Sequence, residues 1–216
     1  MSIQTNMGQD YQTSGKSSLT KREILRKIIH LIPLSIPLAV AIGFPEEIMR
    51  LVLINLPVVF APVEFYRLKV PMSRLNKMLR DQEHNKIAAY YLSLSIAAIL
   101  AIFVMDFRIL LTCLIATNLG DATAALVGKT LGRHHLPLTK TKKIEGTIAG
   151  FLCAFFSTIF FFLDKNLFMI LLCGIIVGMT VIITDFIESP KLIFSDNILN
   201  PLLAAIGLIL CNFWFI

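Results

Sequence analysis

The sequence predicts an all-α protein, a polytopic bundle of about seven transmembrane helices, and three observations support this prediction. Hydrophobic residues make up 56% of the 216 residues and charged residues only 16%, whereas soluble domains average about 45–50% and about 25%. The apolar residues gather in blocks close to the ~20 residues that cross a bilayer core. Backbone polar groups inside lipid need internal partners, so these blocks are expected to be helices.

The apolar blocks follow one another along the chain with charged segments between them. Two blocks are interrupted by residues that are unusual in a span. Pro57, Pro62 and Glu64 fall within the second block, and Asn118 and Asp121 within the fourth. These two blocks are therefore weaker candidates for spans than the other five. The seven blocks cover residues 28–44, 48–65, 87–105, 107–128, 144–163, 167–187 and 198–216.

The N-terminal region differs in composition from the rest of the chain. Residues 1–20 are polar and rich in Ser, Thr and Gln, which is typical of a flexible tail. Residues 21–216 are expected to form a single transmembrane domain. The four cysteines all lie inside blocks and form no CxxC pair, which favours packing roles over disulfides or metal ligands.

The distribution of positive charge predicts the orientation of the chain in the membrane. If the N-terminus is cytoplasmic, 17 of the 20 Lys and Arg residues fall in cytoplasmic segments, and Arg50, Arg108 and Lys165 fall on the opposite side. Positive residues concentrate in cytoplasmic loops. We therefore expect a multi-pass protein with a cytoplasmic N-terminus and a C-terminus on the opposite side. The net charge of +6 then reflects topology, and no nucleic-acid partner is expected.

Asp121 is the strongest functional candidate within a block, because ionisable groups in membrane segments are costly. Asn118 lies three residues earlier, on the same helical face. The alternative is that Asp121 pairs with a nearby Lys or Arg. We interpret it as catalytic or metal-binding. Small residues recur around it at every fourth position, which predicts close helix packing, at Gly120, Ala124, Gly128 and Gly132.

The loop that follows is rich in cations and ends beside an acid. Lys129, Arg133, Lys142 and Lys143 lie within it, and Glu145 follows directly. The simplest interpretation is a positive loop that only sets topology. Cations beside two carboxylates are also what phosphoryl transfer needs, and Mg²⁺ is commonly held by one or two carboxylates plus phosphate oxygens. The loop is therefore a candidate phosphate and Mg²⁺ site.

The segment from 185 to 201 is the least positive of the predicted cytoplasmic loops and carries a single Lys. The simplest interpretation of this segment is a solvated turn in which Asp196 or Asn197 caps the last helix. The polar residues of this segment are Asp185, Glu188, Asp196, Asn197 and Asn200.

Four short motifs occur in order between residues 26 and 201. The chain opens with R-K-x-x-H at Arg26, Lys27 and His30, and an E-H-N-K segment at 83–86 precedes the third block. The centre reads G-D-x-x-A-x-x-x-G, then G-R, then K-x-x-E-G, from residue 120 to residue 146. The end reads D-N-x-x-x-P from residue 196, with Glu188 upstream.

These motifs resemble those of the CTP-dependent lipid-alcohol kinases, which include dolichol kinase, phytol kinase and the yeast-type CTP-dependent diacylglycerol kinase. The related phosphatidate cytidylyltransferases end in H-G-G-x-x-D-R-x-D, so the D-N ending resembles the kinase branch. One position departs from the pattern, because Lys143 stands where K-[ST]-x-E-G has Ser or Thr. Lys142 and Lys143 therefore both remain candidates for contact with the nucleotide.

The resemblance implies that 21–216 is a kinase-like domain that uses CTP as phosphoryl donor and Mg²⁺ as cofactor. The acceptor would be a membrane lipid alcohol, such as a polyprenol, dolichol, phytol or diacylglycerol, at the cytoplasmic face. Whether the protein forms a homo-oligomer stays an open question. The nearer alternative is cytidylyl transfer to a phospholipid, and the more distant one is a small transporter or structural membrane protein.

The resemblance also implies roles for individual residues. Catalysis is assigned to Asp121, Glu145 and Lys142, and the metal ligands would be Asp121, Glu145, Asp196 and Glu188. Nucleotide binding is assigned to Asn118, Gly128, Lys129, Arg133, Lys143, Asp196, Asn197, Arg26, Lys27 and His30.

Overall fold

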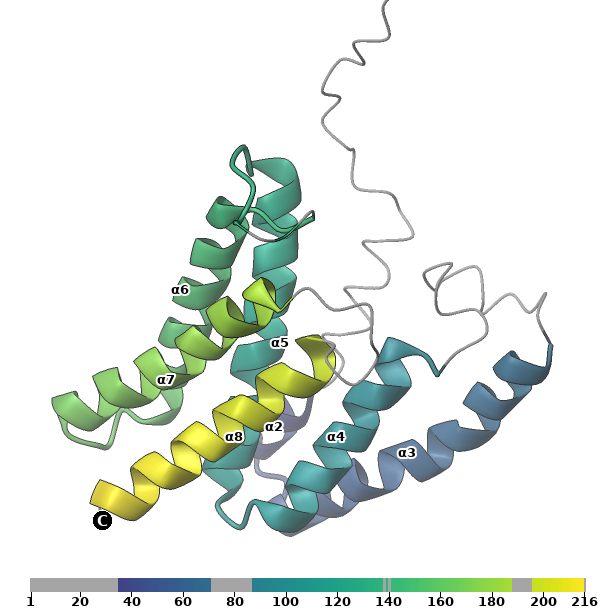
Figure 1. Cartoon of the computed structure of the whole chain (residues 1–216). Helices are drawn as coiled ribbons and strands as arrows, with labels where there is room; N and C mark the ends of the chain where they lie inside the picture. Colours follow the sequence, from purple (N-terminus) through teal and green to yellow (C-terminus); the bar gives the residue numbers. More distant parts are fainter. Residues whose placement is uncertain (1–34, 71–86, 138, 140, 188–195, 216) are drawn as a thin grey trace, which may run out of the picture.

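The structure is a computed structural model that describes residues 35–70, 87–137, 139, 141–187 and 196–215 (Figure 1). The described residues fold into helices, with one isolated antiparallel bridge between His135 and Lys143, so the all-α prediction is confirmed for them. The predicted tail, the opening motif and Glu188 lie outside the described residues. The helices are α2 (Ser35–Ala41), α3 (Glu46–Lys69), α4 (Ala89–Phe103), α5 (Phe107–Thr130), α6 (Ile144–Phe161), α7 (Leu167–Phe186) and α8 (Asp196–Phe215).

Each of these helices coincides with one of the predicted apolar blocks. Four of them, α3, α5, α6 and α7, are long and apolar enough to cross a membrane. The apolar parts of α4 and α8 are shorter, Tyr90–Phe103 and Asp196–Asn212, and α2 is described over seven residues. The structure therefore supports a membrane protein, and the count of seven spans stays a prediction.

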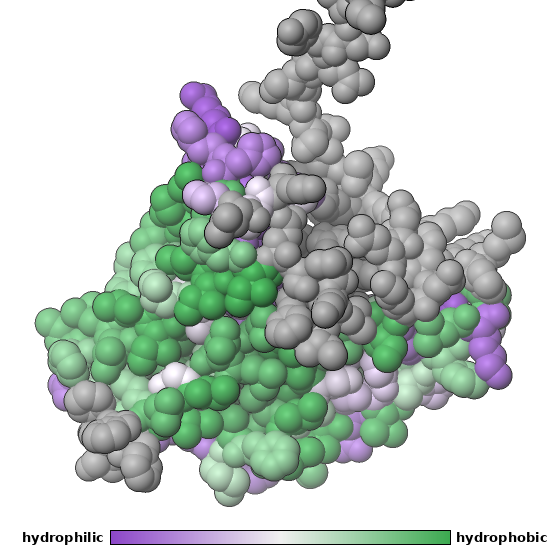
Figure 2. All heavy atoms as spheres, in the orientation of Figure 1, coloured by the Kyte–Doolittle hydropathy of each residue, from purple (hydrophilic) through white to green (hydrophobic). Residues whose placement is uncertain are grey.

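The outward surface of the bundle is largely hydrophobic, as Figure 2 shows for one face. Large apolar side chains point outward along the helices, with Val58 and Val59 of α3 exposed by 69% and 66%, and Phe156 and Phe160 of α6 by 63% and 72%. Soluble monomers rarely expose continuous apolar surface of this kind. Hydrophilic residues gather instead at one end, over the loop between α5 and α6.

The helix starts are set by short polar side chains where the chain supplies them. Asp106 caps α5 by accepting a hydrogen bond from the backbone N–H of Arg108 at 2.8 Å. Asn166 caps α7 in the same way through the N–H of Met169 at 2.9 Å. Such caps satisfy backbone donors that the first helical turn leaves without partners. Helix α3 runs without a break through its two prolines, and the two blocks that were the weaker candidates, α3 and α5, are both long and apolar enough to cross a membrane.

Helix α5 is the centre of the bundle and packs against α6, α7 and α8. Its contact with α6 depends on the small residues predicted to pack closely. A Cβ atom added to Gly150 of α6 would lie 2.8 Å from the Gly120 carbonyl oxygen, and one added to Gly146 would lie 2.8 Å from the Gly128 Cα. Gly132 lies beyond the end of α5, where a Cβ would lie 2.7 Å from the Lys143 Cβ. The predicted packing stripe is confirmed.

Candidate active site

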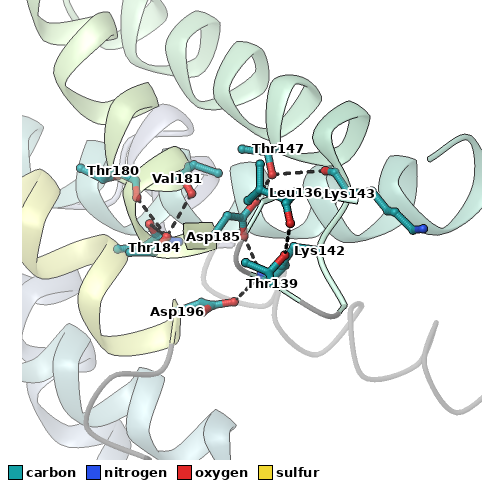
Figure 3. Close-up of polar contacts among 11 residues, drawn as sticks. Leu136, Thr139, Lys142, Lys143, Thr147, Thr180, Val181, Thr184, Asp185 and Asp196 are labelled. Atoms are coloured by element: carbon teal, nitrogen blue, oxygen red, sulfur yellow. Dashed lines mark hydrogen bonds and ion pairs between the residues drawn. The ribbon is translucent and has the colours of Figure 1, made fainter. Parts of the chain in front are cut away.

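Three segments that are distant in sequence meet at one end of the bundle. Lys142 lies two residues before α6, Asp185 lies in the last turn of α7, and Asp196 is the first residue of α8. The Lys142 Nζ lies 2.6 Å from Asp185 Oδ1 and 2.7 Å from Asp196 Oδ2. Figure 3 shows the two carboxylates converging on this one ammonium group.

The loop between α5 and α6 turns Lys142 towards the bundle. The loop folds back on itself through hydrogen bonds from the Ile144 N–H to the His134 carbonyl and from the Leu136 N–H to the Lys142 carbonyl, both at 3.0 Å. Successive side chains of an extended segment point to opposite faces. Lys143 accordingly points away, and its Nζ lies 2.7 Å from His135 Nε2 on the exposed side. Of the two candidate lysines, Lys142 is the one that reaches the carboxylates.

Two threonine hydroxyls support the cluster, one by bonding to Asp185 and the other by bonding to Asn200 of α8. The Thr147 hydroxyl of α6 donates to Asp185 Oδ2 at 2.7 Å, so each oxygen of this buried carboxylate has its own partner. The Thr184 hydroxyl donates to Asn200 Oδ1 at 2.7 Å, which joins the end of α7 to the start of α8. These bonds hold Asp185 and the first turn of α8 in register.

Asp121 and Asp196 both line a small cavity of about 20 Å³. A space of this size accommodates about one water-sized group. Residues of α4, α5 and α8 form its wall, and the lining combines the predicted residues of α5 and α8. The lining residues are Ser93, Leu114, Thr117, Asn118, Asp121, Asp196, Asn197, Asn200 and Pro201.

The charges of the three acids act together on Lys142. Burial alone would lower the pKa of the Lys142 ammonium, but the carboxylates of Asp196, Asp185 and Asp121 outweigh burial and raise this pKa overall. An ammonium whose ordinary pKa is about 10.4 therefore stays protonated at neutral pH. Asp121 is close enough to contribute to this field, which places it electrostatically in the same site.

Other predicted residues lie apart from the Asp185 and Asp196 carboxylates. Glu145 accepts a hydrogen bond from the His134 backbone N–H at 3.1 Å, and its carboxylate lies 2.6 Å from His134 Nδ1. Lys129 and Arg133 are exposed at the same end of the bundle. Gly128 packs against Gly146. The structure thus joins Asp121, Asn118, Lys142, Asp196 and Asn197, and it places Glu145 in the first turn of α6, bonded to His134 of the loop.

Asp185 and Thr147 were not among the residues that the sequence assigned to the site. Asp185 satisfies the criterion that selected Asp121, because it is an acid within an apolar block, but the sequence analysis treated it as part of the following loop. Thr147 gave no comparable signal, since a single threonine near the end of a helix is common. Only the packing of α6 against α7 shows that its hydroxyl meets Asp185.

The donor set at this site fits Mg²⁺ in the presence of phosphate. Among the described residues, no group of three or more His, Cys, Asp or Glu side chains is arranged as a complete metal site. However, Mg²⁺ usually takes one or two carboxylates and completes its shell with water and substrate phosphates. Asp185 and Asp196 already converge on one cation, so they could supply the one or two carboxylates that Mg²⁺ takes from a protein.

A much larger cavity, of about 1080 Å³, lies elsewhere and shares no lining residue with the small one. Apolar side chains such as Leu111, Phe156 and Phe160 line it, and Arg108 and Asp164 lie at its edge. The Arg108 Nη1 is 2.6 Å from Asp164 Oδ1. None of the predicted site residues borders this cavity, so its size does not make it the candidate active site.

The described helices and this cluster indicate a membrane protein in which acids and a cation meet at one end of a helical bundle. The model of the cytidylyltransferase family matches residues 19–190, and the chain belongs to this family. The match includes Asp121, Lys142 and Asp185 and ends before Asp196. Membership indicates an enzyme that uses CTP in lipid chemistry. No curated protein and no solved structure matches the chain.

Proposed function

We propose that this protein transfers the terminal phosphoryl group of CTP to the hydroxyl of a membrane lipid alcohol, giving a lipid monophosphate and CDP. One observation carries the proposal: Lys142 joins carboxylates of α7 and α8 beside a cavity that Asp121 also lines. Phosphoryl transfer depends mainly on cations around the phosphates and on a carboxylate that positions the attacking hydroxyl. The cluster contains both.

The proposed reaction balances without any further reactant. The alcohol oxygen bonds to the γ-phosphorus, the bond between this phosphorus and the β–γ bridging oxygen breaks, and CDP leaves. Asp121 orients the hydroxyl and accepts its proton, and Lys142 neutralises charge on the phosphates. Asp185 and Asp196 would hold Mg²⁺, which supplies positive charge to the triphosphate oxygens.

The acceptor is proposed to reach the site from the bilayer. Exposed apolar side chains surround the helices, so a lipid chain can remain in the membrane while its hydroxyl approaches the polar end of the bundle. We place this end on the cytoplasmic side, where nucleotide is available, because the cationic segments cluster there. The lipid classes proposed are polyprenols, phytol and diacylglycerol.

The second candidate function is transfer of the cytidylyl group of CTP to a phospholipid, with release of pyrophosphate. The family match favours it, since the matching family is that of the cytidylyltransferases. The ending of the chain favours the kinase instead, because Asp196 and Asn197 stand where the phosphatidate cytidylyltransferases have H-G-G-x-x-D-R-x-D. This segment lies beyond the matched residues.

The nucleotide product separates the two functions. Purified protein in lipid nanodiscs is incubated with CTP, Mg²⁺ and a panel of lipid alcohols and phosphatidate, and the products are separated by chromatography and mass spectrometry. We expect CDP and a lipid monophosphate, and no turnover when EDTA removes the metal. Pyrophosphate and a CDP-lipid would show cytidylyl transfer, and the absence of any lipid product would favour a transporter or structural protein.

A further inference from the structure

Lys142 occupies the position that a metal ion would need. Its ammonium lies within hydrogen-bond distance of one oxygen of Asp185 and one of Asp196. Asp185 is buried, and its second oxygen is already taken by Thr147. The oxygens that face the common point are therefore the ones that Lys142 now holds.

The ammonium and a metal ion cannot share these oxygens. Mg²⁺ binds carboxylate oxygens at about 2.0–2.1 Å in a nearly octahedral shell, whereas the ammonium lies 2.6 and 2.7 Å away. Two cations in this space would repel each other strongly, since the protein interior screens charge poorly. Entry of the metal thus requires Lys142 to leave.

Lys142 has both the means and a reason to move. Lysine carries its charge on a flexible four-carbon stem, and Lys142 lies in the loop before α6 and not within a helix. Away from the carboxylates its ammonium, whose side chain is 25% exposed, needs another anion, since a largely buried charge is costly unless it is paired. A nucleotide triphosphate supplies that anion together with the metal.

We propose that Lys142 is an internal counter-ion that closes the Asp185–Asp196 pair and gives way only when metal and triphosphate arrive together. The inference rests on the proposed function and concerns the regulation of the same site. Metal alone competes with Lys142, whereas triphosphate draws Lys142 away and opens the pair. Metal and nucleotide therefore strengthen each other's binding by the same factor, as linkage requires.

Binding of Mn²⁺, measured by electron paramagnetic resonance on the full chain in nanodiscs without nucleotide, tests the proposal. Lys142→Met should bind Mn²⁺ at least about tenfold more tightly than the wild type, which lies within the usual range of coupling between sites. Lys143→Met is the matched control, because it removes the same charge one residue away from a side chain that contacts His135. It should bind Mn²⁺ as the wild type does, and so should Lys142→Arg.

Equal or weaker Mn²⁺ binding by Lys142→Met would overturn the proposal, as would an equal gain in Lys143→Met. If Lys142→Met fails to fold, Lys142→Gln replaces it, and the wild type supplies a second measurement. The β,γ-methylene analogue of CTP should tighten Mn²⁺ binding to the wild type at least about tenfold, and no tightening would contradict the proposal. None of these measurements needs turnover, so the kinase assignment can fail while the counter-ion role stands, or the reverse.

Discussion

Two buried ionic clusters in this protein use similar groups in different ways. In the first, Arg67 of α3 contacts both oxygens of Glu64 on the same helix, at 2.5 and 2.8 Å. The Glu64 carboxylate also accepts from the backbone N–H of Ala88 and the hydroxyl of Tyr90, both at 2.8 Å. In the second, one ammonium is shared between acids of two helices.

The clusters also differ in access. The side chains of Arg67 and Glu64 are 1% and 5% exposed, whereas those of Lys142 and Asp196 are 25% and 30% exposed. A planar guanidinium that meets a carboxylate through two bonds is held in place, while an ammonium is a point charge that exchanges partners readily. A buried charge alone therefore does not mark a functional site. A better indication is an ion pair that joins two helices and stays partly exposed beside a cavity.

The largest effect is expected from Glu64→Gln, which breaks the first cluster. Arg67 then keeps its buried charge without the carboxylate, and breaking a buried ion pair costs about 3–5 kcal/mol of stability. Activity per folded molecule should remain near that of the wild type. Thermal unfolding and specific activity in nanodiscs measure the two quantities. A stable Glu64→Gln protein that has lost its activity would place this cluster in the catalytic machinery.

Asp121→Asn should have the next largest effect. It should lower activity and leave stability nearly unchanged, the reverse of the pattern expected for Glu64→Gln. The substitution keeps the size of the side chain and removes the charge beside Lys142. We expect activity to fall at least about a hundredfold, the scale of losing a general acid or base, with thermal stability nearly unchanged. If Asp121 only forms a structural ion pair, the protein will lose stability and keep appreciable activity.

A smaller effect is expected from Thr147→Val, which removes the hydroxyl that donates to Asp185. A hydrogen bond to a charged group contributes about 1.5–3 kcal/mol, so activity should fall at least about tenfold and the Mg²⁺ concentration for half-maximal activity should rise. Thr147→Ser keeps the donor and should restore both. A valine variant with a normal Mg²⁺ requirement would show that Thr147 only packs against α7.

The sequence predicted the helices well because their main determinant is local. An apolar run of the right length has to be helical inside lipid, so α5 begins at the predicted residue Phe107. Pro57 and Pro62 made the second block a weaker candidate, yet α3 continues through both and is long enough to cross a membrane. Membrane helices tolerate proline where neighbouring groups satisfy the backbone.

The site was only partly predictable, because its geometry depends on contacts between distant segments. Asp121 could be selected by the cost of a charge in a span, and it does line a cavity with Asp196. Whether Lys142 or Lys143 faces inward depends on how the loop folds back, as does the bond between Glu145 and His134. Composition and spacing do not encode this register.

Transfer of label from CTP to the lipid tests the proposed phosphoryl transfer most directly. The purified protein, the lipid acceptor panel and Mg²⁺ are incubated in parallel with CTP labelled at the γ-phosphate and with CTP labelled at the α-phosphate, and the lipids are extracted. If the protein is a kinase with Asp121 as its base, γ-label enters the lipid and α-label does not. Asp121→Asn then reduces the transfer at least about a hundredfold. Entry of α-label into the lipid would contradict phosphoryl transfer and establish the cytidylyl reaction in its place.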